Sequence, residues 1–88
     1  MFNIELLMQG KFGTYARVLA LPIAPFPGLR INLGGPDGNS ATAVVKTVWY
    51  DEPTGEIHAW LEEQDFASHK TEADEASDFL AWGFRYDR

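Results

Sequence analysis

The strongest constraint on the fold is a hairpin signal in the middle of the chain. Two segments rich in β-branched and aromatic residues, 42–50 and 57–62, flank the turn-forming sequence Asp51-Glu-Pro-Thr-Gly-Glu56. Pro53 suits the first central position of a type I turn, and Gly55 suits the left-handed position that follows. This pattern predicts a β-hairpin with a three-residue loop and a bulge, so the rest of the chain is expected to build a sheet around it.

The predicted turn also implies a register, in which Glu52 lies opposite Glu56. The opposite charges of Lys46 and Glu62 then face each other, and such a pair favours the register by a fraction of a kcal/mol. One face of the hairpin would carry Val45, Thr47, Trp49, Ile57, Ala59 and Leu61. The other face would carry Val44, Val48, Tyr50, His58 and Trp60. Both faces are too apolar for simple exposure to solvent.

Three further strands are predicted before this hairpin. Residues 2–8 alternate between apolar and mostly polar positions, and residues 14–21 return after the glycines of the 10–13 turn. A proline-rich connector over residues 22–28 then leads to a short strand over residues 29–33. The run of turn formers at residues 34–40 is expected to be a mobile loop. It lacks the sequence pattern of a phosphate-binding loop.

One helix is predicted near the C-terminus. Thr71 and Asp74 have the spacing of a capping box, and the acidic residues that follow suit the positive end of a helix dipole. A helix over residues 72–82 would place Ala76, Phe79 and Leu80 on one stripe that packs against the sheet.

These elements predict one domain over residues 1–88 and a mainly β fold with a short α element. The expected architecture is a small five-stranded antiparallel sheet, strongly bent or closed into a barrel, with one C-terminal helix. The absence of cysteine excludes disulfides and thiolate metal sites, so the apolar core must hold the fold. No segment has the roughly 20 apolar residues needed to span a bilayer, and the N-terminus does not resemble a signal peptide. We therefore expect a soluble cytoplasmic protein that does not bind membranes.

The net charge of −6 is unevenly distributed. Residues 1–50 carry four basic and two acidic side chains, whereas residues 51–88 carry three basic and eleven acidic ones. Direct binding of nucleic acid is not expected, because phosphate contacts need clustered lysines and arginines. The acidic C-terminal region is either a solvated surface that keeps the protein soluble or a face that docks on a basic partner.

Enzymatic, cofactor and metal sites find little support in the sequence. A metal site would require His58 and His69 to converge with carboxylates such as Glu62 or Asp65, and no metal-binding motif is present. The serines lie outside any nucleophile motif. The acidic groups of the predicted helix, among them Glu75, occupy positions typical of a solvated surface. We therefore expect a protein without catalytic activity and without cofactors.

The favoured hypothesis is a non-enzymatic protein-interaction module. Its surface would combine the aromatic face of the hairpin with the acidic region, and the candidate partner-binding residues are Tyr50, His58, Trp60, Glu62, Glu63 and Asp65. The competing interpretation is that both hairpin faces are covered, one by the other strands and one by the C-terminal aromatic residues. The partner would be a protein with a basic surface, or a second copy of this chain.

Two alternatives belong to other functional classes. A small-molecule-binding barrel or minor enzyme would have its pocket under the proline-rich loop, lined by Phe26, Trp49 and Trp60. An acidic inhibitor would instead imitate nucleic acid and block the groove of a nucleic-acid-binding protein. A closed aromatic pocket would favour the first alternative, and an open apolar patch with carboxylates at its rim would favour the interaction module.

Overall fold

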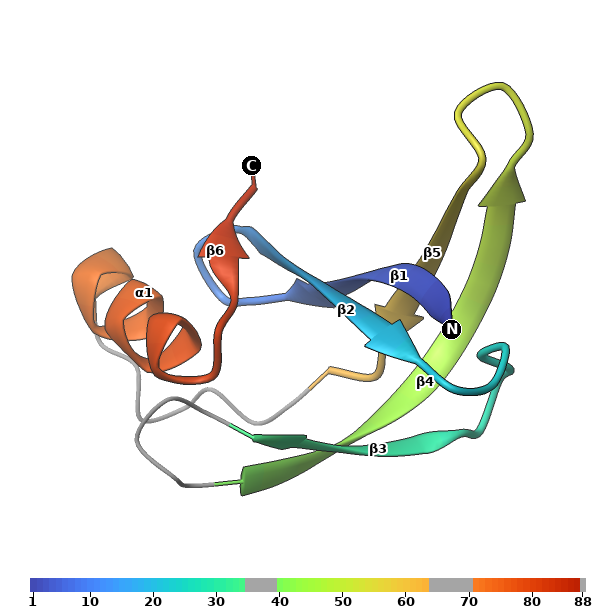
Figure 1. Ribbon diagram of the computed structural model, residues 1–88. Coiled ribbons are helices and arrows are strands. Elements are labelled where there is room, and N and C mark those ends of the chain that lie inside the picture. The colour runs from blue at the N-terminus through green and yellow to red at the C-terminus, as the bar shows by residue number, and fades with distance from the viewer. Residues whose placement is uncertain (35–39, 64–70, 88) are drawn as a thin grey trace.

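A computed structural model describes residues 1–34, 40–63 and 71–87 of the chain (Figure 1). Residues 35–39, which belong to the predicted mobile loop 34–40, and residues 64–70 lie outside the described residues. The elements, in chain order, are β1 (Phe2–Gln9), β2 (Thr14–Leu21), β3 (Arg30–Gly34), β4 (Ser40–Asp51), β5 (Glu56–Leu61), α1 (Glu72–Ala81) and β6 (Arg85–Tyr86).

The strands form one mixed sheet with the order β3-β4-β5-β1-β2-β6. The mainly β class, the bent sheet and the C-terminal helix are confirmed. The predicted five strands correspond to β1–β5, and the described residues add the two-residue strand β6. The pairs are antiparallel except for β1 with β5, which run parallel. This parallel pair sets Ile57 and Ala59 beside Ile4 and Leu6, so the inward apolar positions of both strands coincide.

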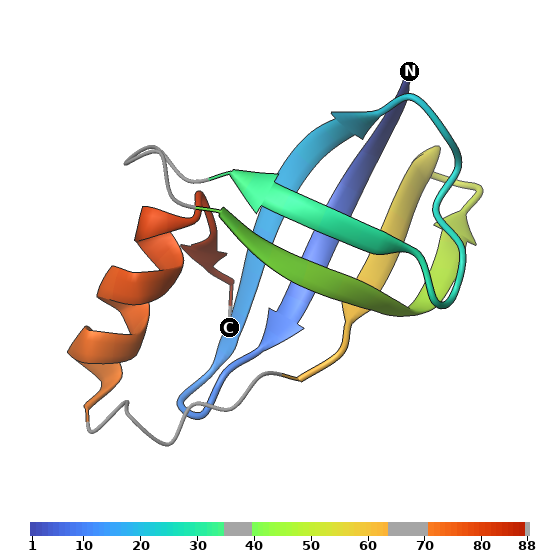
Figure 2. The same cartoon turned by 90° about the horizontal axis from the view of Figure 1, so that it is seen from below.

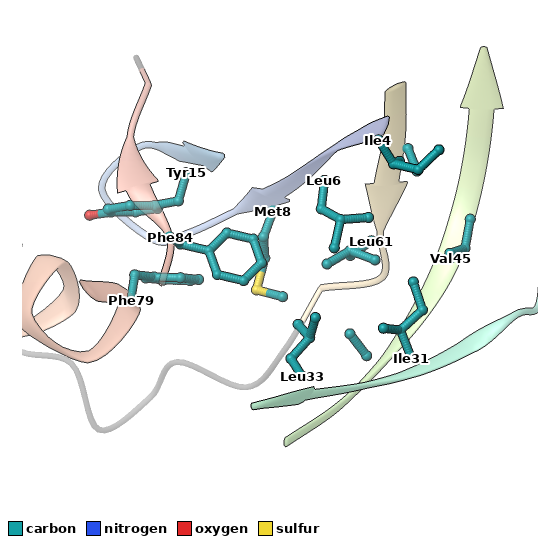
Figure 3. Packing of buried hydrophobic residues seen from close by; sticks show 12 residues of the cluster. Ile4, Leu6, Met8, Tyr15, Ile31, Leu33, Val45, Leu61, Phe79 and Phe84 are labelled. Carbon is teal, nitrogen blue, oxygen red and sulfur yellow. The ribbon is translucent and has the colours of Figure 1, made fainter. Parts of the chain in front are cut away.

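The sheet curls into a half-barrel around its core. β3 and the first half of β4 cross over the layer formed by β1, β2 and β5 (Figure 2). Alternate residues of these strands fill the space between the layers with apolar side chains, as Figure 3 shows. The core cluster comprises Ile4, Leu6, Met8, Tyr15, Ile31, Leu33, Ala43, Val45, Ala59, Leu61, Phe79 and Phe84. The alternation predicted for residues 2–8 thus describes which side chains of β1 point inward.

The register of the β4–β5 hairpin differs from the predicted one by one residue. Asp51, not Glu52, lies opposite Glu56, because the Gly55 N–H donates to the Asp51 carbonyl (2.8 Å) and the loop holds four residues. Gly55 has the expected positive φ of 71°. A bulge at Lys46 then shifts the pairing again, so that Val45 lies opposite Leu61. The predicted pair of Lys46 with Glu62 is therefore wrong.

Helix α1 begins at the predicted cap. The Thr71 hydroxyl accepts a hydrogen bond from the Asp74 N–H (3.2 Å), as the capping-box spacing predicts. Phe79 then stacks on Tyr15 of β2, with 4.2 Å between ring centroids. The expected inward position of Leu80 is wrong, since this side chain is exposed and Glu75 faces the sheet instead.

The burial of Glu75 overturns the prediction that the helix carboxylates are all solvated. Its side chain is 0% exposed, and it accepts hydrogen bonds from the backbone N–H groups of Lys11 and Phe12, the latter at 2.8 Å. The Tyr15 hydroxyl donates a third hydrogen bond at 3.2 Å. Glu75 thereby joins the helix to the β1–β2 turn. A buried carboxylate is tolerated here because each oxygen has donors.

Candidate functional site

The outer face of the sheet, opposite the core, carries the candidate site. Pairing across the strands brings its side chains onto one surface, because residues opposite each other point to the same side. Trp49 lies opposite His58 in the hairpin, and the parallel pairing places His58 beside Glu5. We use the name outer face for Glu5, Leu7, Val18, Thr47, Trp49, His58 and Trp60. The apolar side chains at its surface are accessible: Val18 is 69% exposed and Trp49 is 38% exposed.

His58 is the centre of this face. Its ring stacks on the Trp49 indole, with 5.0 Å between ring centroids and 16° between the planes. Nδ1 lies 2.8 Å from Glu5 Oε1, and Nε2 lies 3.2 Å from Glu56 Oε2. The imidazole side chain is only 12% exposed, whereas the Glu56 side chain is 60% exposed. The cluster therefore presents an indole and two carboxylates that the imidazole holds in place.

Trp60 occupies the other end of the outer face. It lies beside Leu7 in the parallel pair, and Leu7 is buried although it does not belong to the core cluster. Trp60 thus covers an apolar residue on the outside of the sheet and is itself half-buried. A shallow cavity of about 260 Å³ adjoins it, lined by Gln9, Lys46, Thr47, Trp60, Leu61 and Glu63.

The structure separates the three aromatic residues that were predicted to share one face of the hairpin. His58 and Trp60 share the outer face as expected, but Tyr50 lies opposite Ile57 and belongs to the other side of the sheet. The turn causes this, because its loop holds four residues instead of the predicted three and so reverses the side to which the β4 residues opposite His58 and Ile57 point. Trp49 takes the place assigned to Tyr50, and sequence reasoning missed it for that reason.

The acidic candidates have different positions. Glu62 and Glu63 are exposed just after β5, and Glu63 borders the cavity beside Trp60. Asp65 lies outside the described residues, as does His69. Glu5 and Glu56, which are not among the candidates predicted from the sequence, are the carboxylates that contact the aromatic cluster. Their positions were hidden in the sequence because the contact of Glu5 with His58 depends on the β1–β5 pairing.

Within the described residues, neither a cluster of metal ligands nor the alternative ligand pocket is found. In the part of the chain that the structure describes, no three metal-ligating side chains gather. Trp49 and Trp60 lie on the outer face, while Phe26 is exposed on the proline-rich loop. These three rings therefore do not line a common pocket, and the inside of the curled sheet is filled by the core. No helix among the described residues is long and apolar enough to cross a membrane.

Comparisons of this chain with protein-family models, with curated proteins and with solved structures give no match. The fold and the site define a small curled-sheet domain that presents an aromatic and acidic outer face. Inferences about its function therefore rest on the geometry of that face.

Proposed function

We propose that this chain is a protein-interaction module that binds a positively charged segment of another protein on its outer face. The observation that carries the proposal is the Trp49–His58 stack held between the carboxylates of Glu5 and Glu56. A lysine or arginine side chain needs an apolar surface for its stem and a negative group for its head. The outer face offers both within one cluster.

The aromatic residues supply the attractive surface. An indole attracts cations to its ring face, and tryptophan is enriched among the residues that dominate binding energy at protein interfaces. Trp49 has one ring face against His58 and is more than one-third exposed. Val18, on the neighbouring part of the sheet, extends the apolar surface.

The charges of the outer face favour a basic partner. Glu5 and Glu56 flank His58, and Glu63 borders the cavity beside Trp60. With a net charge of −6, the chain also attracts cationic partners over longer distances at low ionic strength. A role in binding, not catalysis, is proposed because the hydrogen-bond partners of His58 among the described residues are both carboxylates.

Nuclear magnetic resonance with a lysine- and arginine-rich peptide of about ten residues tests the proposal. The indole N–H signal of Trp49 and the ring signals of His58 should shift on titration, and the apparent affinity should fall steeply as salt rises to physiological strength. A lysine-free, acidic peptide of equal length is the control and should cause no shift. Shifts confined to residues away from the outer face, or no binding at low salt, would refute the proposal.

A further inference from the structure

Strand β2 has a free edge over most of its length. Its pairing with β1 covers the whole strand, from Thr14 to Leu21. On its other side β6 pairs only with Tyr15 and Ala16. From Arg17 to Leu21, no other strand of the described chain lies along this edge. Unpaired strand edges accept further strands from other chains.

The backbone groups of this edge are oriented for such an addition. The Asp87 N–H donates to the Thr14 carbonyl (2.8 Å), so Thr14 directs its backbone groups toward β6. In an antiparallel ladder this direction alternates along the strand. Val18 and Ala20 therefore direct their N–H and C=O groups to the free side, and both residues are exposed.

A cavity of about 390 Å³ lies where the free edge meets β6. Its lining residues are Ala16, Arg17, Val18, Gly83, Arg85, Tyr86 and Asp87. Two of the seven basic residues of an acidic chain thus border one cavity, together with a single carboxylate, that of Asp87. This cavity is therefore the most favourable place on the edge for a negatively charged group.

The guanidinium groups of Arg17 and Arg85 have N–H groups that can donate hydrogen bonds to a ligand. Arg17 uses one terminal nitrogen, which donates to the carbonyls of Gly34 (3.1 Å) and Trp82 (2.9 Å). Its other N–H groups make no hydrogen bond with the described residues. The Arg85 side chain is exposed. Arginine pairs well with carboxylates because its planar fork matches their geometry.

The direction of the chain selects which end of a peptide reaches this cavity. A strand added antiparallel to β2 runs in the same direction as β6, and it must stop before Arg85, where β6 begins. The chain around Gly83 and the fully buried Phe84 occupies the path beyond. The added strand therefore ends at the cavity with its C-terminus. A parallel strand would bring a positively charged N-terminus to the two arginines, which is unfavourable.

We propose that the free edge of β2 binds the C-terminal segment of a partner protein by strand addition, with the terminal carboxylate in the cavity between Arg17 and Arg85. Backbone hydrogen bonds to Val18 and Ala20 supply the pairing, and the arginines recognise the end of the chain. Val18 belongs to both surfaces, but the strand addition uses its backbone groups and not the Trp49–His58 cluster, so the inference does not depend on the proposed function.

A pool of hexapeptides rich in valine, isoleucine and threonine, made both as free acids and as C-terminal amides, tests the proposal by fluorescence polarisation. Members should bind as free acids and at least about tenfold more weakly as amides. Methylation of the peptide nitrogen that pairs with Val18 should also weaken binding, since it removes a ladder hydrogen bond. Equal binding of acids and amides, or no binding by any member of the pool, would overturn the proposal.

Variants locate the site. Arg85→Gln should reduce the affinity for the acids to that for the amides, whereas Arg30→Gln, which changes an exposed arginine on β3, should leave it unchanged. Equal effects of the two variants would contradict the assignment. Light scattering of the chain alone gives a further check. A dimer that Val18→Lys dissociates would show that a second copy occupies the edge, and this result would also overturn the proposal.

Discussion

The Tyr15 hydroxyl donates a hydrogen bond to the buried carboxylate of Glu75, 60 residues away in the sequence. Two backbone N–H groups of the β1–β2 turn donate to the same carboxylate. Through this one side chain, the C-terminal helix is attached to the first hairpin of the chain. The contact supports the packing of Phe79 on Tyr15, which closes that end of the core.

Substitution of Glu75 should therefore destabilise the fold markedly. Glu75→Gln keeps the size of the side chain but replaces an acceptor oxygen by a donor that faces other donors, so the free energy of unfolding should fall by about 2–4 kcal/mol. Urea unfolding followed by circular dichroism measures this. Glu72→Gln, at an exposed position of the same helix, is the control and should change stability by less than about 0.5 kcal/mol. Similar effects of the two substitutions would contradict the assigned role.

Gly10 should be required at its position because there is no room for a larger side chain. A Cβ atom there would lie 2.5 Å from Glu75 Oε1 and 2.9 Å from Tyr15 Cε2. Gly10→Ala must displace these groups and should lower stability by about 1–3 kcal/mol. Gly34→Ala is the matched control, since a Cβ at Gly34 meets no atom within 4 Å. Thermal unfolding of both variants tests the difference, and an unchanged Gly10→Ala midpoint would show that the carboxylate can move at little cost.

The sequence predicts the features that depend on neighbouring residues. The Thr71 cap, the positive φ of Gly55 and the inward alternation of β1 all follow from residues close together in the chain. The bulge at Lys46 could not be predicted, because it arises where β4 passes from its pairing with β3 to its pairing with β5 in the hairpin. The hairpin loop also holds four residues where three were predicted, and this one extra residue exchanges Tyr50 for Trp49 in the candidate site.

The inward position of Glu75 escaped prediction for a different reason. An acidic residue in the first turn of a helix is favoured at the surface by the helix dipole, so local reasoning has no cause to bury it. The donors that satisfy it belong to Lys11 and Phe12, at the other end of the sequence. Contacts of this kind become visible only when the two ends of the chain are placed together.

Alkaline pH should remove stability that Tyr15 contributes. Burial, together with the adjacent Glu75 carboxylate, raises the pKa of Tyr15 from 10.0 to about 12. Because the pKa is higher in the folded state, the contribution is complete below pH 10 and is lost as the pH rises toward about 12. The expected loss is about 2–3 kcal/mol. The difference in unfolding free energy between the wild type and Tyr15→Phe, measured from pH 9 to pH 12, should shrink accordingly; a constant difference would contradict this account.

The two tryptophans of the outer face should differ in their effect on stability. Trp60 covers the buried Leu7, so Trp60→Ala should cost about 2–3 kcal/mol. Trp49 is more exposed, and Trp49→Ala should cost about 1 kcal/mol. Chemical unfolding of the two variants checks this order. The reverse order would mean that Trp49, not Trp60, contributes more to the packing of this face.

The affinity of the Trp49→Ala and Tyr50→Ala variants for a lysine- and arginine-rich peptide tests the central claim most directly. The two residues are adjacent in β4, both are exposed, and they point to opposite sides of the sheet. If the outer face is the binding surface, isothermal titration calorimetry should show a loss of at least about tenfold for Trp49→Ala and little change for Tyr50→Ala. A larger loss for Tyr50→Ala, or equal losses for both variants, would contradict the claim.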